Sequence, residues 1–339
     1  IFLSLIIIGC GHKNIYYDPE KSHHTEQGFT NPYLELDRKG KSLSDRFKFF
    51  KMIFEKRPNP NENDHATRLE FSILDSLIKN NKRFAVWIGH STVLMHIDGK
   101  FILTDPIFSE RCSPLSFLGP KRYSKTAIPI DRLPLIDIVL ISHNHYDHLD
   151  LETVRLLGDD TRWVVPLGLK EWFINHGISN VNEYDWWEDG SFENIKLSCL
   201  PSQHWSKRSM LRSFNTLWAS WAVEINGFKF WFAGDTGYNE VQFKEIGNLK
   251  GPFDFSAIPI GAYEPRWFMK NFHVNPEESV LIHRDVKSSK SIGIHWGTFI
   301  LTTEPIYEPP VKLKNALVNN QIDSTAFITT EIGEIIIFD

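Results

Sequence analysis

Short apolar segments of strand length recur along the chain after Arg83, and each ends at a polar or turn-forming residue. Short apolar segments bounded by turn signals predict β-strands. The pairs Asp98-Gly99 and Asn226-Gly227 separate neighbouring segments and are typical of two-residue hairpin turns. The predicted strands cover residues 84–88, 93–97, 101–104, 138–141, 163–165, 195–200, 219–225, 228–233, 255–260, 291–294 and 334–338.

Longer amphipathic stretches lie between these strands and predict helices. Two more helices are expected before the first strand, at residues 44–54 and 66–79, separated by the breaker-rich residues 58–64. Strand meanders mixed with helices predict an α/β fold in which helices cover the sheets in layers. The predicted helices after the first strand cover residues 151–157, 169–176, 240–247, 276–284 and 310–318.

The beginning of the sequence has a different character. Residues 1–10 read IFLSLIIIGC and resemble the apolar core and lipobox of a bacterial lipoprotein signal whose front end is missing. This segment is shorter than the roughly 20 apolar residues that span a bilayer. We therefore expect Cys10 to carry a lipid anchor, with a plain signal peptide or a buried strand as the alternatives. Such an anchor would hold the protein on a membrane surface, facing the periplasm or the cell exterior.

Changes in composition divide the rest of the chain into three parts. Residues 11–30 are polar and predict a tether. Residues 31–82 carry charge with scattered apolar positions and predict a helical extension. Residues 83–339 contain the strand pattern and are expected to form the main domain.

The overall composition is that of a folded globular protein. Hydrophobic residues make up 42% and charged residues 23%, so extended disorder is not expected. Cys10, Cys112 and Cys199 form neither a disulfide scaffold nor a CxxC metal pair. The net charge of -5 argues against nucleic acid as a partner, because nucleic-acid-binding proteins usually carry a basic face. An anionic substrate stays open, since bound metal ions can reverse the local field.

The strongest chemical signal is SHNHYDHLD at residues 142–150, directly after a predicted strand. His143 and His145 can point the same way in an extended backbone, and Asp147 and His148 follow at once. Zinc accepts neutral imidazole and carboxylate ligands readily. The motif therefore predicts a metal site, and the alternative is a set of buried histidines satisfied by hydrogen bonds.

Further ligand candidates follow other predicted strands. His204 lies in PSQH, Asp235 in GDTG and His295 in GIHWG, each just past an apolar segment. Parallel strands would bring these ends together at one edge of a sheet. A two-metal site needs more than the three protein ligands of a single catalytic zinc, and these residues supply them.

The order of these motifs resembles the metallo-β-lactamase superfamily. The resemblance implies an α/β fold with four layers, arranged as an αββα sandwich. It also implies a second metal on Asp147, His148 and His295, with Asp235 bridging the two. The first metal would be held by His143, His145 and His204.

A narrower resemblance rests on additional motifs. The chain is similar to the N-acylphosphatidylethanolamine-hydrolysing phospholipase D family over roughly residues 30–339, and the segment at 258–270 is the most specific part. The resemblance implies hydrolysis of N-acylphosphatidylethanolamine to an N-acylethanolamine and phosphatidic acid. The motifs are WIGHS at 87–91, LTDPIF at 103–108, GPKR at 119–122, IPIGAYEPRWFMK at 258–270 and IHWGT at 294–298.

The family resemblance also implies catalytic residues. Asp147 and Asp235 are expected to serve catalysis through the metals. His273 matches a family histidine at the mouth of the active site, so we expect it to contact the substrate. The alternative for His273 is a surface position in a loop that leads into a helix.

Other residues of the motifs are expected to bind substrate or to support the ligands. We expect Tyr263, Arg266 and Trp267 to line the entrance, with a packed tryptophan beside a paired arginine as the alternative. His90 is expected to orient the first loop rather than to bind metal. Asp105 is expected to hold a ligand histidine, a role that metal sites commonly need.

Two zinc ions are the expected cofactors, although His and Asp ligands also accept iron, manganese or cobalt. Their charge outweighs that of Asp147 and Asp235, so a phosphodiester is attracted, and hydroxide formed from metal-bound water can attack phosphorus. The expected partners are a membrane phospholipid and, from the family resemblance, a second copy of the chain. The alternatives are hydrolysis of another phosphodiester or of a lactone or acyl bond, a nuclease, and a lipid-binding lipoprotein without catalysis.

Overall fold

A computed structural model describes residues 13–34, 69–208 and 213–338 of the chain. The predicted signal segment with Cys10 and the predicted helix at residues 44–54 lie outside the described residues. Of the predicted helix at 66–79, the structure shows α2 (Phe71–Lys79).

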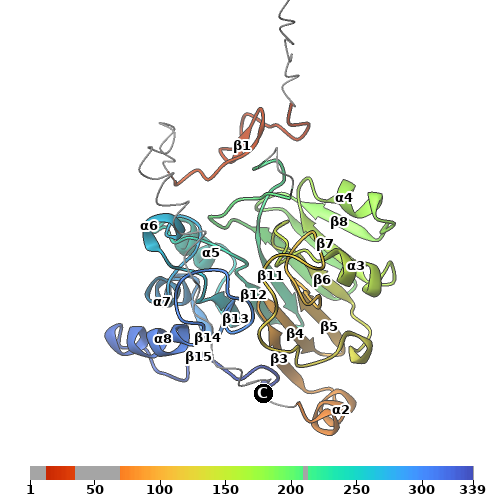
Figure 1. Cartoon of the computed structure of the whole chain (residues 1–339), viewed down its shortest axis with the longest axis vertical. Coiled ribbons are helices and arrows are strands. Elements are labelled where there is room, and N and C mark those ends of the chain that lie inside the picture. Colours follow the sequence, from red (N-terminus) through yellow and green to blue (C-terminus); the bar gives the residue numbers. More distant parts are fainter. Residues whose placement is uncertain (1–12, 35–68, 209–212, 339) are drawn as a thin grey trace, which may run out of the picture.

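Two seven-stranded mixed sheets form the centre of the molecule (Figure 1). The first sheet contains, in spatial order, β16 (Ile335–Phe338), β3 (Arg83–Gly89), β4 (Thr92–Ile97), β5 (Lys100–Thr104), β6 (Ile138–Leu140), β7 (Arg162–Pro166) and β8 (Val181–Tyr184). The second sheet contains β15 (Phe327–Ile328), β14 (Ser288–Ile294), β13 (Phe253–Pro259), β12 (Phe228–Phe232), β11 (Ser220–Ile225), β10 (Ile195–Leu200) and β9 (Asp189–Phe192).

Helices cover the outer face of each sheet. On the first sheet α2 is joined by α3 (Leu151–Leu157) and α4 (Lys170–Asn175), and their buried residues share one apolar cluster with the sheet. The second sheet is covered by α5 (Gln242–Leu249), α7 (Pro276–Asp285) and α8 (Glu308–Asn319) through another cluster. A third cluster, which includes the fully buried Trp221, fills the space between the sheets. The predicted αββα sandwich is therefore confirmed.

Local sequence explains several element boundaries. Asp98 and Gly99 both have positive φ, 48° and 81°, as the tight turn between β4 and β5 requires. The Asn226-Gly227 turn between β11 and β12 has the same character. Asn275 caps α7, since its side chain accepts from the Glu278 backbone N–H and the Glu278 side chain accepts in return.

Strand direction brings the candidate ligands to one edge. β10 and β12 both pair antiparallel with β11, so they run in the same direction, and β12, β13 and β14 are parallel. The residues that follow β10, β12 and β14 therefore emerge at the same end of the second sheet. The Trp221 Nε1–H donates to the Ile141 carbonyl over 2.8 Å, which ties this end to the strand that leads into the histidine motif.

Residues 13–34 differ from the predicted polar tether. They contain the short hairpin of β1 (His24–Thr25) and β2 (Gly28–Phe29), and they pack on the domain. Phe29 is buried in the core between the sheets, and the His23 and His24 side chains hydrogen-bond to Asp185. Polar composition misled the prediction because these polar groups are paired with the domain rather than with water.

Candidate metal centre

Three histidines converge at the end of the two sheets. The His143 Nε2 and His145 Nδ1 atoms lie 2.8 Å apart, and His145 Nδ1 lies 3.3 Å from His204 Nε2. His143 and His145 come from the loop after β6, and His204 comes from the loop after β10. Four-coordinate zinc with bonds of 2.0–2.1 Å to nitrogen places its ligand atoms about 3.3 Å apart, which this group approaches.

A second group lies beside the first. The His148 Nε2 and His295 Nε2 atoms are 3.3 Å apart, and the Asp147 Oδ2 atom lies 3.4 Å from the former and 3.6 Å from the latter. These atoms lie close enough together to hold one metal ion. His295 follows β14 directly and has a positive φ of 64°, and its ring lies near the side chain of Asp147.

Asp235 lies between the two groups. Its Oδ2 atom is 3.1 Å from His148 Nε2 and 3.9 Å from His204 Nε2. Its Oδ1 atom is buried and makes no hydrogen bond within the described part of the chain, although His295 Nε2 lies 3.2 Å away. A buried carboxylate oxygen without a hydrogen bond fits a position that faces a cation. The structure thus brings all seven predicted ligands together.

The protonation of the histidines suits metal binding in the first group. Burial lowers the pKa of His145 to about 4 and that of His204 to about 3, and it holds the pKa of His143 well below its usual value. These imidazoles are therefore neutral near pH 7, as metal ligands must be.

In the second group, nearby charges outweigh burial and favour the charged forms of His295 and Asp147. Burial lowers the pKa of His295, but the carboxylates of Asp235 and Asp147 outweigh this effect and raise it to about 9. Burial would raise the pKa of Asp147, yet the charge of His148 holds it well below its usual value. A cation bound here would take the place of the proton that the carboxylates now favour.

Hydrogen bonds fix the ligand rings from behind. The His148 Nδ1 atom lies 2.6 Å from Asp105 Oδ2, and Asp105 is fully buried, so Asp105 makes the predicted contact with one of the candidate ligand histidines. The His204 Nδ1–H donates to the Phe272 carbonyl over 2.9 Å. His143 Nδ1 lies 2.9 Å from the Ser142 hydroxyl. Such contacts select the tautomer that leaves the other ring nitrogen free for a metal.

His90 lies closer to the centre than the sequence indicated. Its Nε2 atom is 3.1 Å from Asp147 Oδ2, and its ring lies 4.1 Å from that of His295. Its backbone N–H donates to the Thr298 hydroxyl over 2.7 Å, which holds the loop after β3 against the loop after β14. His90 therefore orients the side chain of Asp147 as well as the first loop.

A cavity of about 590 Å³ lies beside the two groups, and His145, Asp147 and Asp235 are among its lining residues. His273 also lines it, with its Nδ1 atom 3.8 Å from Asp235 Oδ2. The predicted position of His273 at the mouth of the site agrees with this geometry. Burial lowers the pKa of His273 to about 3, so its ring is neutral.

Tyr263 and Arg266 require a correction, because neither side chain lines this cavity. The Tyr263 hydroxyl is buried and donates to the Glu308 carboxylate over 2.7 Å. The Arg266 guanidinium pairs with Glu278 at 2.7 Å and donates to the His273 carbonyl over 2.8 Å. Arg266 thus supports the loop of His273 from behind.

α6 (Arg266–Met269) was not predicted from the sequence, and it places a different pair of residues on the wall. Phe268 and Met269 line the cavity, whereas Trp267 is half exposed and lies outside the cavity lining. A short helix turns successive side chains in different directions, so a motif read as one stretch cannot tell which of its residues face the substrate.

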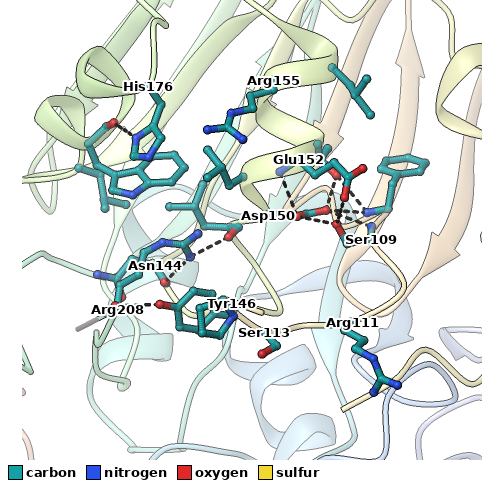
Figure 2. Close-up of a pocket in the computed structure, with 18 of the residues that line it drawn as sticks. Ser109, Arg111, Ser113, Asn144, Tyr146, Asp150, Glu152, Arg155, His176 and Arg208 are labelled. Atoms are coloured by element: carbon teal, nitrogen blue, oxygen red, sulfur yellow. Dashed lines mark hydrogen bonds between the residues drawn. The ribbon is translucent and has the colours of Figure 1, made fainter. Parts of the chain in front are cut away.

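Lys207 and Arg208 also line the cavity, and sequence reasoning missed them. Both follow His204 in the segment HWSKR, and this closeness to a predicted ligand was the available signal. A larger cavity of about 1170 Å³ shares lining residues with this one. Figure 2 shows its lining, where Arg208 donates to the Asn144 and Leu149 carbonyls. Pro114, Tyr146 and Arg208 line both cavities, so a basic side chain lies where the two meet.

Comparisons with known proteins agree with this geometry. A family model described as the beta-lactamase superfamily domain matches residues 100–296. The N-acyl-phosphatidylethanolamine-hydrolyzing phospholipase D 1 of Caenorhabditis elegans is 45% identical over 266 residues, which cover 74% of this chain and 75% of that protein. The mitochondrial N-acyl-phosphatidylethanolamine-hydrolyzing phospholipase D of Saccharomyces cerevisiae is 37% identical over 267 residues, covering 74% of this chain and 57% of that protein.

A solved structure supports the fold. The possible metal-dependent hydrolase from Veillonella parvula superposes with a TM-score of 0.60 at 16% identity, covering 76% of this chain and 99% of that chain. At this identity the likeness concerns the fold alone. The two phospholipase D relatives, at 45% and 37% identity, show a shared family. This chain belongs to the N-acyl-phosphatidylethanolamine-hydrolyzing phospholipase D family of the beta-lactamase superfamily.

Proposed function

We propose that this chain hydrolyses phospholipids of the N-acylphosphatidylethanolamine type to an N-acylethanolamine and phosphatidic acid. The observation that carries the proposal is the convergence of two adjacent His/Asp groups beside an open cavity, in a chain 45% identical to a relative named for this reaction.

Two divalent cations, with zinc as the first candidate, are the proposed cofactors. His143, His145 and His204 would hold one of them. Asp147, His148 and His295 would hold the other, with Asp235 placed between the two groups. When bound, such cations lower the pKa of water and offset the charge of a phosphodiester.

The side chains around the cavity have separate tasks in this proposal. Asp235 and Asp147 orient the reacting groups where they line the cavity. The neutral ring of His273, in the lining 3.8 Å from Asp235, is placed to hydrogen-bond an oxygen of the substrate. Lys207 and Arg208 supply positive charge where a phosphate would enter.

An apolar surface next to the cavity supports a lipid substrate. The loop at residues 113–118 contributes Pro114 to the cavity lining, and its large apolar side chains are exposed. Leu115 is 43% exposed, Phe117 75% and Leu118 59%. Exposed apolar side chains grouped beside a binding site are typical of contact with membranes or apolar partners.

The membrane association itself is a separate proposal. It rests on the lipobox-like segment ending in Cys10, and it would place the enzyme on the periplasmic or outer surface of a bacterial cell as a lipoprotein. Among the helices that the structure describes, none combines the length and the apolar character needed to cross a bilayer. A homodimer is proposed from the family relationship.

The decisive experiment incubates the zinc-loaded protein without residues 1–10 with N-acylphosphatidylethanolamine in mixed micelles. Products are identified by mass spectrometry, and Asp147→Asn serves as the inactive control. We expect N-acylethanolamine and phosphatidic acid from the parent and neither from the variant. A parent that binds about two metal ions per chain without forming these products would refute the proposed substrate and direct the search to other phosphodiesters or lactones.

A further inference from the structure

The N-terminal segment, residues 13–34, reaches the main chain of a proposed metal ligand. The Asn31 side chain is 4% exposed, and its Nδ2–H donates to the His204 carbonyl over 2.8 Å. The Phe29 backbone N–H donates to the Phe214 carbonyl over 2.8 Å, and the Phe29 ring lies in the core between the sheets. Two contacts thus join this segment to residues 201–208, which include His204, and to residues 213–217.

Residues 201–208 and 213–217 are held together by hydrogen bonds. The Phe214 N–H donates to the Ser206 carbonyl, and the Ser206 hydroxyl donates to the Thr216 carbonyl. The ring of His204 is fixed by the Phe272 carbonyl, whereas its main chain is fixed by Asn31. A substitution of Asn31 would therefore shift the backbone of His204 and, with it, the orientation of the His204 ring.

The N-terminal segment is itself fixed to the domain at its other end. The Asp185 carboxylate accepts from Lys21 at 2.6 Å, from His23 at 2.7 Å and from His24 at 2.9 Å. Within the segment, the Asn14 Nδ2–H groups donate to the Thr25 and Gly28 carbonyls.

The close packing of the N-terminal segment against Phe214 also requires glycine at position 28. A Cβ atom at Gly28 would lie 2.1 Å from the Phe214 carbonyl oxygen, so only glycine permits this contact. In Figure 1 the segment with β1 lies at one end of the molecule, above the two sheets.

We propose that the N-terminal segment is a working part of the active site and that Asn31 is a positioning residue for His204. The segment lies outside the matched family domain, which begins at residue 100. The inference rests on the metal-binding role proposed above for His204. Its consequence is that metal retention by the three-histidine group depends on residues far from that group in sequence.

The test compares Asn31 with Asn14, a second buried asparagine of the same segment, whose side-chain hydrogen bonds among the described residues all stay within the segment. Asn31→Asp replaces the donating amide by an oxygen that faces the His204 carbonyl, Asn31→Ala removes it, and Asn31→Gln keeps the amide on a longer stem. Zinc-loaded full-length proteins are mixed with a chromophoric chelator, and the rate of zinc loss is recorded together with thermal stability, kcat and KM.

We expect zinc loss about tenfold faster for Asn31→Ala and faster still for Asn31→Asp, with Asn31→Gln nearer the parent. Asn14→Ala should lower thermal stability without changing the rate of zinc loss. In Asn31→Ala, kcat should fall more than KM changes, because the ligand rather than the substrate pocket is displaced.

If zinc is lost at the same rate from the Asn31 variants and from Asn14→Ala, the proposal is overturned. The N-terminal segment would then contribute to stability alone. If Asn31→Asp fails to fold, Asn31→Gln and Asn31→Ala still decide the question. The chelator assay contains no lipid, so a protein that retains zinc in this order but does not cleave N-acylphosphatidylethanolamine would refute the proposed substrate while supporting the role of Asn31.

Discussion

Asp105→Asn is the substitution that tests the metal centre most sharply without touching a ligand. The Asp105 Oδ1 atom accepts from the Ser142 N–H over 2.7 Å, and Oδ2 lies 2.6 Å from His148 Nδ1. Asparagine can keep the first bond only by turning its NH2 group towards His148. The Nδ1 atom of His148 would then have to accept, which moves the ring proton to Nε2.

The expected loss of metal affinity follows from the position of that proton on the His148 ring. His148 Nε2 is the atom that lies 3.1 Å from Asp235 and 3.3 Å from His295, so its protonation removes one proposed ligand. Loss of a residue that orients a ligand typically reduces metal affinity 10- to 100-fold, or about 1.4–2.7 kcal/mol. We expect a loss at the upper end of this range, because the substitution reverses the tautomer as well as removing a charge.

The assay is competition with a chromophoric chelator, supported by elemental analysis of bound metal per chain. Asp98→Asn is the matched control, because Asp98 pairs with Arg83 at a surface turn where asparagine is equally suited to positive φ. Unchanged affinity of both metals in Asp105→Asn, with kcat near the parent value, would refute the assigned tautomer. A parallel fall in affinity for Asp98→Asn would show a general loss of stability instead.

Three further predictions concern other parts of the structure. His273→Gln should lower kcat about 100-fold or more while bound metal stays unchanged, and a kcat near the parent value would remove His273 from the reaction. Tyr263→Phe removes the bond to Glu308, so urea unfolding should show a loss of about 1.5–3 kcal/mol with kcat/KM close to the parent; a large change in KM would restore Tyr263 to the substrate pocket. Burial raises the pKa of Asp185, but bonds from His23 and Lys21 outweigh this and hold it below its unfolded value of about 3.9. These contacts therefore stabilise the fold fully above about pH 5, and the stabilisation is lost as the pH falls below that value. The urea midpoint of Asp185→Asn should therefore depend less on pH below about pH 5 than the midpoint of the parent.

Much of the fold could be predicted because its strands are apolar and bounded by turns. The predicted strand at residues 195–200 has the bounds of β10, and the predicted helix at 151–157 has those of α3. The strands β8 and β9 were missed because their sequences, VNEY and DGSF, carry little apolar signal. They form because neighbouring strands supply hydrogen-bond partners, which is a tertiary effect on weak local propensity.

The site shows the same division between local and distant information. The histidine motif at residues 143–148 could be predicted because metal ligands of suitable type stand within a few residues of one another. The contact of Asn31 with His204 spans 173 positions and leaves no local pattern. Tyr263 was misassigned because a motif shows which residues belong together, whereas burial and pairing with Glu308 decide which of them face the substrate.

The pairing of β16 with β3 affects how the chain can fold during synthesis. Ile335 pairs with Val86 and Phe338 with Arg83, so the edge of the first sheet joins residues separated by most of the chain. A ribosome must therefore release residues 335–338 before β3 gains its outer neighbour, and until then that strand exposes an unpaired edge. Loss of this pairing would open the same edge to aggregation while leaving every proposed metal ligand in place.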